Sequence, residues 1–289
     1  MISLQTNVTS LFAQEQLNLN SNFESNTIQQ LTSGYRINSS GDDAAGLAVA
    51  NQLQAGIVQL QQGVINASNA QSTLQTMDGG LSNISNLLDR LQTLATESAS
   101  GTFSGNRTTL NNEFQSVLTE ITRQAGNIGL ATGGPAPTTS GPISTSQYNT
   151  AALSVFIGAG DTTATDNRVT IDLTNGGNGV DATGLGLVGG TAVDTAANAV
   201  TALGLIQTAI GNLGTVQGAV GAGENLLNYA TNLANSQITN QSSAESSIKD
   251  ANIAAEAANL AKAQTLQQSS IAALAQANAM PAALLKLLQ

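Results

Sequence analysis

The sequence predicts a mainly α-helical protein whose long antiparallel helices, drawn from the two ends of the chain, pair as a coiled coil or bundle shaft. Apolar residues recur every seven positions over long stretches on both sides of the middle. Proline is absent from residues 1–134 and 143–280, so nothing breaks long helices there. The middle is rich in Gly, Thr and Pro, and its alternating apolar residues predict a small β-hairpin.

The amino-terminal half carries the longest predicted helices. Residues 1–56 have a helical composition, and we expect one helix over 44–99. Its seven-residue row is Leu60, Ala67, Leu74, Leu81, Leu88 and Ala95. A second row, Ile57, Val64, Gln71, Met77, Ile84 and Leu91, slips by one position after Gln71. The slip predicts a bend or a local rewinding at Asp78-Gly79-Gly80.

Three further helices are predicted. One spans about 106–125, with Leu110, Phe114, Val117 and Ile121 on one face. Another spans about 194–242, with Ile206, Leu213, Val220, Leu227 and Ala234 in one row and Leu203 and Ile210 beside it. The last, within 244–289, repeats through Ile253, Ala257, Leu260, Gln264, Gln267, Ile271, Leu274 and Asn278. Polar residues in such a seam weaken it but constrain register and partner number. We therefore expect an assembly seam at Leu260, Gln264, Gln267, Ile271 and Leu274.

The middle is expected to decorate the outside of the helical shaft. Residues 151–157 and 169–173 predict the two strands, and 175–192 predict turns with a candidate short strand at 184–188. Three regions follow. They are an inner terminal domain (1–43 with 244–289), a helical shaft (44–130 with 194–243) and a short solvent-facing region (131–193).

Composition excludes most catalytic classes. The chain of 289 residues has no Cys and no His, so it has no disulfide, thiol nucleophile, imidazole base or zinc ligand of these types. We expect no enzyme activity and no cofactor. Eight scattered basic residues give no footprint for nucleic acid. No basic region followed by an apolar stretch marks a secretory signal, and no run of about 18 apolar residues predicts a transmembrane helix.

The surface chemistry favours contacts between subunits. Charged residues are 9% of the chain, against about 25% in ordinary soluble domains, and the net charge is −10. Neutral polar groups can be buried with hydrogen bonds, whereas an unpaired buried charge is costly. Compositional drift is the alternative explanation.

Two local patterns have a structural and a chemical interpretation. Asp42-Asp43 could bind a metal or act as an acid and base, but no third ligand follows at a suitable spacing. Helix initiation, with Ser40 or Asp42 as the cap, is the favoured interpretation. Gly184–Gly189 spells GxGxxG, but it lies about ten residues after the strand and lacks the acidic residue of a dinucleotide site. A turn-rich loop is favoured there.

Both ends of the chain resemble the signatures of bacterial flagellins. At the amino terminus these are residues 6–11 (TNVTSL) and 33–50 (SGYRINSSGDDAAGLAVA). At the carboxy terminus they are residues 250–268 (DANIAAEAANLAKAQTLQQ), residues 274–278 (LAQAN), Pro281 and the final Leu-rich run. The resemblance covers about 1–125 and 194–289, with both ends in the right order.

This resemblance implies an extracellular structural subunit that polymerises with itself into the flagellar filament for swimming. It implies export in unfolded form through the flagellar type III apparatus, with folding on assembly. The implied partners are the hook-junction and cap proteins and an export chaperone on the carboxy-terminal helix. Neither nucleic acid nor membrane insertion is implied.

The resemblance also implies a surface that the host Toll-like flagellin receptor reads. Residues 88–95 and 112–114 look like that surface, and Arg90, Leu94 and Glu113 match the family's principal contacts. Gln92 and Thr93 depart from the family's usual charged pair, which predicts weaker affinity.

Three rival interpretations compete with this one. A hook–filament junction protein shares the amino-terminal signature, but the full match at 250–278 argues against it. An enzyme-bearing flagellin needs a His-Glu-x-x-His insertion, and the chain has no His. A secreted adhesin or virulence translocator with coiled-coil ends needs an exposed apolar patch or a large variable domain, which the short middle does not predict.

Overall fold

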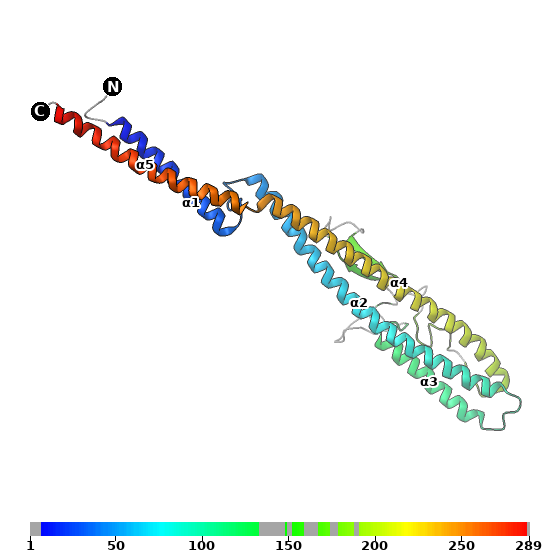
Figure 1. Ribbon diagram of the computed structural model, residues 1–289. Coiled ribbons are helices and arrows are strands. Elements are labelled where there is room, and N and C mark those ends of the chain that lie inside the picture. The colour runs from blue at the N-terminus through cyan, green and yellow to red at the C-terminus, as the bar shows by residue number, and fades with distance from the viewer. Residues whose placement is uncertain are drawn as a thin grey trace. The chain divides into compact units, whose positions relative to one another are not determined.

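The computed structural model describes residues 7–132, 148, 152–158, 167–173, 179–187 and 191–287, with side chains up to Met280. Within these residues it contains α1 (Val8–Ser33), α2 (Ala44–Ala99), α3 (Arg107–Asn127), β1 (Leu153–Phe156), β2 (Arg168–Ile171), α4 (Ala196–Lys249) and α5 (Ile253–Leu287) (Figure 1). The predicted mainly α class is confirmed. The predicted region 131–193 lies partly outside the described residues.

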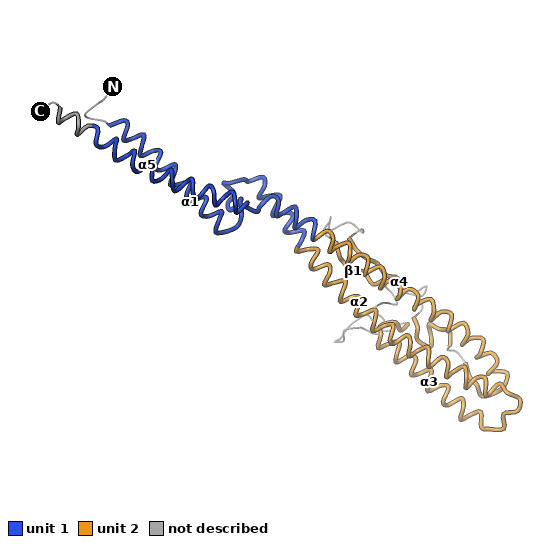
Figure 2. Tube along the Cα trace, in the orientation of Figure 1, with its two compact units in different colours: residues 1–57, 239–289 blue, residues 58–238 orange. Residues whose placement is uncertain are grey.

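The chain forms two compact units (Figure 2). Unit 1 contains residues 1–57 and 239–289, and unit 2 contains residues 58–238. Unit 1 is built around the terminal hairpin, which we define as α1 packed antiparallel against α5. Asn7 makes two contacts at the start of this hairpin. Its Oδ1 accepts from Ser10 N at 3.1 Å and caps α1, and its Nδ2 donates to Ala277 O of α5 at 2.8 Å.

The end of α1 is fastened to the start of α5. Gly34 ends α1 in the left-handed conformation (φ 74°), which glycine adopts without strain. Tyr35 then forms a β-bridge with Asp250. Arg36 N donates to Lys249 O at 2.7 Å, and Ala251 N donates to Gly34 O at 2.9 Å. The Lys249 ammonium lies 4.5 Å from the centre of the Tyr35 ring.

The burial pattern of α2 corrects the predicted slip. A continuous row of buried positions alternates by three and four: Leu60, Gly63, Ala67, Ala70, Leu74, Met77, Leu81, Ile84, Leu88, Leu91, Ala95 and Ser98. The second row therefore runs through Gly63 and Ala70, and Val64 and Gln71 lie beside it, only half-buried. The helix runs through Asp78-Gly79-Gly80 without a break. Small residues at the start of the row concealed its register.

The same seven-residue pattern organises α4. The predicted row from Ile206 to Ala234 is fully buried. Its companion row is Ala202, Ala209, Val216, Gly223 and Ala230, whereas the predicted companions Leu203 and Ile210 are half-buried at the edge. In unit 2 this helix runs antiparallel to α2, with Gln71 Nε2 3.5 Å from Asn228 Oδ1.

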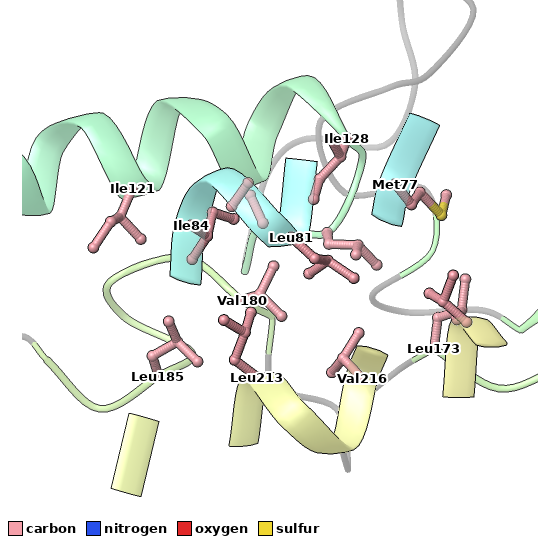
Figure 3. Packing of buried hydrophobic residues seen from close by; sticks show 14 of the residues in the cluster. Met77, Leu81, Ile84, Ile121, Ile128, Leu173, Val180, Leu185, Leu213 and Val216 are labelled. Atoms are coloured by element: carbon pink, nitrogen blue, oxygen red, sulfur yellow. The ribbon is translucent and has the colours of Figure 1, made fainter. Parts of the chain in front are cut away.

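Described residues of the middle belong to this core, although the sequence predicted a position on the outside of the shaft. Val180 and Leu185 are buried among Met77, Leu81, Ile84, Ile121, Ile128, Leu213 and Val216 (Figure 3). Val155, Ile157, Ile171, Leu173 and Leu187 belong to the same cluster. Described residues of the middle therefore stabilise the helices, because their apolar area is removed from water.

The GxGxxG segment is a turn in its described part, 184–187, and forms no strand there. The loop around it is centred on Asp181, which is buried. Asp181 Oδ1 accepts from Thr132 N and Gly184 N, each at 3.1 Å, and from the Thr132 hydroxyl at 2.5 Å. The loop is therefore held by an internal carboxylate, so it is not open to a phosphate.

The strands β1 and β2 pair antiparallel, with Leu153 opposite Ile171 and Phe156 opposite Arg168. The hairpin packs on two glycines. A Cβ at Gly63 of α2 would lie 2.7 Å from the Ile157 carbonyl carbon and against its oxygen. A Cβ at Gly223 of α4 would lie 2.7 Å from Ile171 Cγ2. These two positions permit the close approach of the hairpin to the helices.

An ion pair lies on the exposed side of α3. Arg123 Nε donates to Glu120 Oε2 at 2.8 Å, and Gln124 Nε2 donates to Glu120 Oε1 at 2.8 Å. The Arg123 hydrogen bond, followed by the Gln124 hydrogen bond, lowers the pKa of Glu120 to about 2. Because the pKa of Glu120 is lowered on folding, its carboxylate stabilises the fold at pH values above the ordinary glutamate pKa. That contribution to stability is lost as pH falls through about 2.

Candidate functional site

The first candidate surface joins α2 to α3 in unit 2. Arg90 of α2 forms an ion pair with Glu113 of α3, in which Arg90 Nε and Nη2 both donate to Glu113 Oε1, the former at 2.8 Å. The two side chains are 49% and 45% exposed. An exposed pair of this kind contributes at most about 1 kcal/mol to stability, so its geometry matters more for recognition.

Leu94 does not share that surface. It is fully buried and belongs to the core cluster, so it does not offer a contact to a partner in this structure. Its neighbours on the outside are Asp89, Gln92, Thr93, Thr96 and Glu97, which line a shallow depression. The hydroxyls of Thr93 and Thr96 donate to Asp89 O and Gln92 O of their own helix. The three matched residues are therefore two surface groups and one core side chain.

The second candidate surface is the terminal hairpin, whose inner face mixes leucines with small and polar side chains. A row of half-buried or buried residues of α1 is spaced by three and four: Ser10, Ala13, Leu17, Asn20, Glu24, Thr27 and Leu31. Thr27 of α1 and Ala263 of α5 are the most buried residues of this face. Asn20 Nδ2 donates to Ser270 Oγ at 2.7 Å across the hairpin. The large apolar residues of this face, Leu17, Leu31, Leu260 and Leu274, are all only half-buried, so the seam between α1 and α5 within one chain is weak.

The outer face of the hairpin carries the large apolar side chains. On α1 the exposed ones are Val8, Leu11, Phe12, Leu19, Phe23 and Ile28, and on α5 they are Ile253, Leu266, Ile271 and Met280. Leu11 and Phe12 are 64% and 62% exposed. The sequence prediction missed the α1 residues, although their spacing along a helix of polar residues was the available signal. Apolar area concentrated on an outer face marks a contact surface.

The predicted assembly seam divides between the two faces. Leu260, Gln267 and Leu274 are half-buried on the side of α5 that meets α1. Gln264 and Ile271 are exposed, as are Ile253 and Ala257 of the same predicted row, whereas Asn278 accepts a hydrogen bond from Ser10 Oγ of α1 at 2.7 Å. The row drawn from sequence therefore combines a contact within the chain with positions that are open to another chain.

The adjacent acids Asp42 and Asp43 serve the backbone. Asp43, rather than Ser40 or Asp42, is the cap of α2, since its Oδ1 accepts from Gly46 N at 2.8 Å. Asp42 Oδ2 accepts from Asn38 N and Ser39 N at 2.9 and 2.8 Å. The Ser39 and then the Asn38 backbone hydrogen bonds lower the pKa of Asp42. Among the described residues no cluster of three or more acidic groups could hold a metal ion.

One helix in the described part of the chain, α4, is long and apolar enough to cross a membrane, with a window of mean hydropathy 1.3. The absence of an uninterrupted apolar run is therefore not sufficient to exclude a span. In unit 2, however, Ile206, Leu213 and Val220 of α4 are buried in the protein core. Core packing buries 33% of the most apolar stretch of this helix and so accounts for part of its hydropathy.

Comparison with known proteins identifies close similarity over the whole chain. Residues 4–128 match the bacterial flagellin N-terminal helical region, and residues 203–288 match the bacterial flagellin C-terminal helical region. A flagellin of Listeria monocytogenes is 33% identical over 99% of both chains. A flagellin of Halalkalibacterium halodurans is 30% identical over 98% of both chains. The crystal structure of Bacillus cereus flagellin matches with a TM-score of 0.46 and 26% identity, over 63% of this chain and 94% of that one.

Paired terminal helices with an apolar outer face are typical of a structural protein that assembles with other chains. The matched terminal regions and the full-length relatives make the class specific. The chain belongs to the bacterial flagellin family. It is a structural subunit of the extracellular flagellar filament and belongs to no enzyme family.

Proposed function

We propose that this chain polymerises through the outer face of its terminal hairpin, and that the hairpin becomes stable only when neighbouring copies cover that face. The exposed apolar side chains of the hairpin carry the proposal: Phe12 and Ile271 lie outside, whereas the most buried inner positions are the small Thr27 and Ala263. Burial of large apolar side chains against neighbours would supply the free energy that the inner face lacks.

The charge distribution along the helices supports burial between copies. Residues 44–77 and 195–223 contain no Asp, Glu, Lys or Arg, although many of their side chains are exposed. Hydroxyls on these surfaces are already bonded to their own helix, as Thr208 is to Gly204 O and Thr215 to Gly211 O. The free-energy cost of removing water from such a surface, when another chain covers it, is therefore small.

Export in unfolded form through the flagellar type III apparatus, with folding at the filament tip, is part of the proposal. A terminal hairpin with a weak inner seam suits a segment that must stay unfolded until it meets its neighbours. A chaperone that covers α5 before export, and contacts with the hook-junction and cap proteins, complete the proposed set of partners. Their support is the family resemblance at both ends of the chain.

Seeded and unseeded polymerisation of purified monomer tests this function. We expect tubular filaments by electron microscopy, a rise in helicity by circular dichroism on assembly, and loss of assembly after deletion of residues 250–289. A monomer that is already fully helical and stays soluble in the presence of seeds would contradict the proposal and favour a junction or capping role.

We further propose that the surface around Arg90 and Glu113 is read by the host Toll-like flagellin receptor in the monomer. Both side chains are about half exposed and held in one geometry by their ion pair. Buried Leu94 would act on this surface only by holding α2 in place. If filament packing covers the surface, assembly and receptor binding compete.

The substitution Arg90→Asp is expected to lower receptor binding by the monomer at least about tenfold, because it places two carboxylates together and removes a guanidinium. Arg123→Asp is the matched control, since Arg123 also forms an exposed ion pair on α3. Binding measured on immobilised receptor should be unchanged for the control. Equal affinity of the Arg90→Asp variant and the native chain would refute the proposal.

A further inference from the structure

We propose that Glu15 on α1 of one copy forms an ion pair with Lys262 on α5 of a neighbouring copy, and that this pair sets the register between terminal hairpins. The proposal rests on the polymerisation proposed above and names a specific contact within it. It concerns two residues that no comparison assigns a role.

Glu15 lies in the middle of the exposed apolar patch of α1. Leu11, Phe12 and Leu19 are four before, three before and four after it on the helix, so they share its face. These three side chains are 64%, 62% and 55% exposed. When another chain covers this patch, the Glu15 carboxylate loses water and requires a cationic partner.

Lys262 is the one basic residue among the described side chains of α5. It is exposed on the outside of the terminal hairpin, one turn from the exposed Leu266. The nearby Thr265 hydroxyl donates to Ala261 O of its own helix at 2.9 Å. Residues 257, 258 and 261 are exposed alanines, so the ammonium is the distinctive group of this surface.

The other acidic residues of the described hairpin lie away from the exposed apolar patch of α1. Glu24 is half-buried on the inner face of α1. Glu256 accepts a hydrogen bond from Asn259 Nδ2 at 3.2 Å. Within the described residues neither Glu15 nor Lys262 forms an ion pair. One outward acid on α1 and one outward base on α5 are therefore complementary and unmatched.

The two groups do not meet within one chain because of the hairpin register. Contacts of Asn7 with Ala277 and of Asn20 with Ser270 place Glu15 level with residues between 270 and 277. Lys262 lies eight residues beyond Ser270, roughly 12 Å further along a helix that rises about 1.5 Å per residue. A neighbouring copy shifted along the hairpin axis can bring its Lys262 to Glu15.

Charge-reversal variants distinguish an ion pair between two copies from an ion pair within one copy. The variants Glu15→Lys and Lys262→Glu would each place like charges together in a homopolymer. For each we expect the critical concentration for seeded polymerisation to rise about tenfold or more, which corresponds to about 1.4 kcal/mol per subunit. An equimolar mixture of the two variants should polymerise, since the introduced lysine of one variant then meets the introduced glutamate of the other. The double reversal should also polymerise.

Each outcome decides the proposal. Single variants that polymerise like the native chain would overturn it and would leave both groups to another partner. Rescue by the double variant but not by the mixture would overturn it in favour of a pair within one chain. Failure of the native chain to polymerise would refute the proposed function itself. Melting curves of the monomeric variants should match the native curve, because both side chains are exposed.

Discussion

Replacing Gly63 by alanine should destabilise unit 2 by about 1–3 kcal/mol, because the new methyl group overlaps main-chain atoms. Its Cβ would lie 2.7 Å from the carbonyl carbon and 2.8 Å from the Cα of Ile157, just beyond β1. A backbone contact does not relax by a rotamer change, so the β-hairpin must move away from α2. Val155 and Ile157 would then lose part of their burial in the core.

The replacement Gly79→Ala is the matched control in the same helix. Nothing lies within 4 Å of a Cβ at Gly79, and the residue is exposed. Alanine in an exposed helix interior is about 0.5–1 kcal/mol more favourable than glycine. The free energy of unfolding, measured by urea denaturation of monomeric protein, should therefore be higher for Gly79→Ala and lower for Gly63→Ala than for the native chain. Equal stability of the two variants would show that the hairpin does not require Gly63.

The sequence predicted the helices well where a single strong row ran along them. The bounds of α2 agree with the predicted 44–99 because Leu60 to Ala95 repeat without interruption and no proline intervenes. The companion row was misassigned because Gly63, Ala70 and Ser98 have no strong apolar signal of their own. Burial of a small residue follows from the closeness of its neighbour, which periodicity does not report.

The middle was misjudged for a different reason. Val180, Leu185 and Leu187 stand singly beside glycines, so no local period announces a buried segment. They are buried because Asp181 gathers the loop into a turn that fits between α2, α3 and α4. In the sequence, nothing distinguishes Asp181 from an acidic residue on the surface. Its role depends on Thr132, 49 residues away.

The candidate surfaces were predicted in part. Resemblance named both Arg90 and Glu113 as receptor contacts, and the structure brings them together across α2 and α3. It also included Leu94, which the core buries. On α5 a repeat of three and four does not say which positions meet α1: Leu260, Gln267 and Leu274 do, whereas Gln264 and Ile271 are exposed. Ordinary amphipathic reasoning puts large apolar side chains inside, whereas Phe12 and Ile271 lie outside.

That exposed apolar surface leads to the largest expected effect on assembly. The double substitution Phe12→Gln and Leu19→Gln should leave the monomer as stable as the native chain within about 0.5 kcal/mol, since surface changes are usually neutral. Phe12 is 62% exposed and Leu19 is 55% exposed. In the polymer the same two side chains are expected to be buried, at about 1.5–3 kcal/mol each. The critical concentration for polymerisation should then rise more than about a hundredfold.

The variant Ala263→Gln should affect the hairpin itself as well as assembly, because Ala263 is fully buried between α1 and α5. This variant should lose helicity in the terminal hairpin wherever that hairpin is formed, and assembly should fail with it. Polymerisation measured beside circular dichroism distinguishes the two cases. If the Phe12 and Leu19 variant assembles normally, the apolar outer face is not the contact surface, and the weak inner seam must be stabilised in some other way. If this variant remains an intact monomer that does not assemble, neighbouring copies cover the outer face of the hairpin in the polymer.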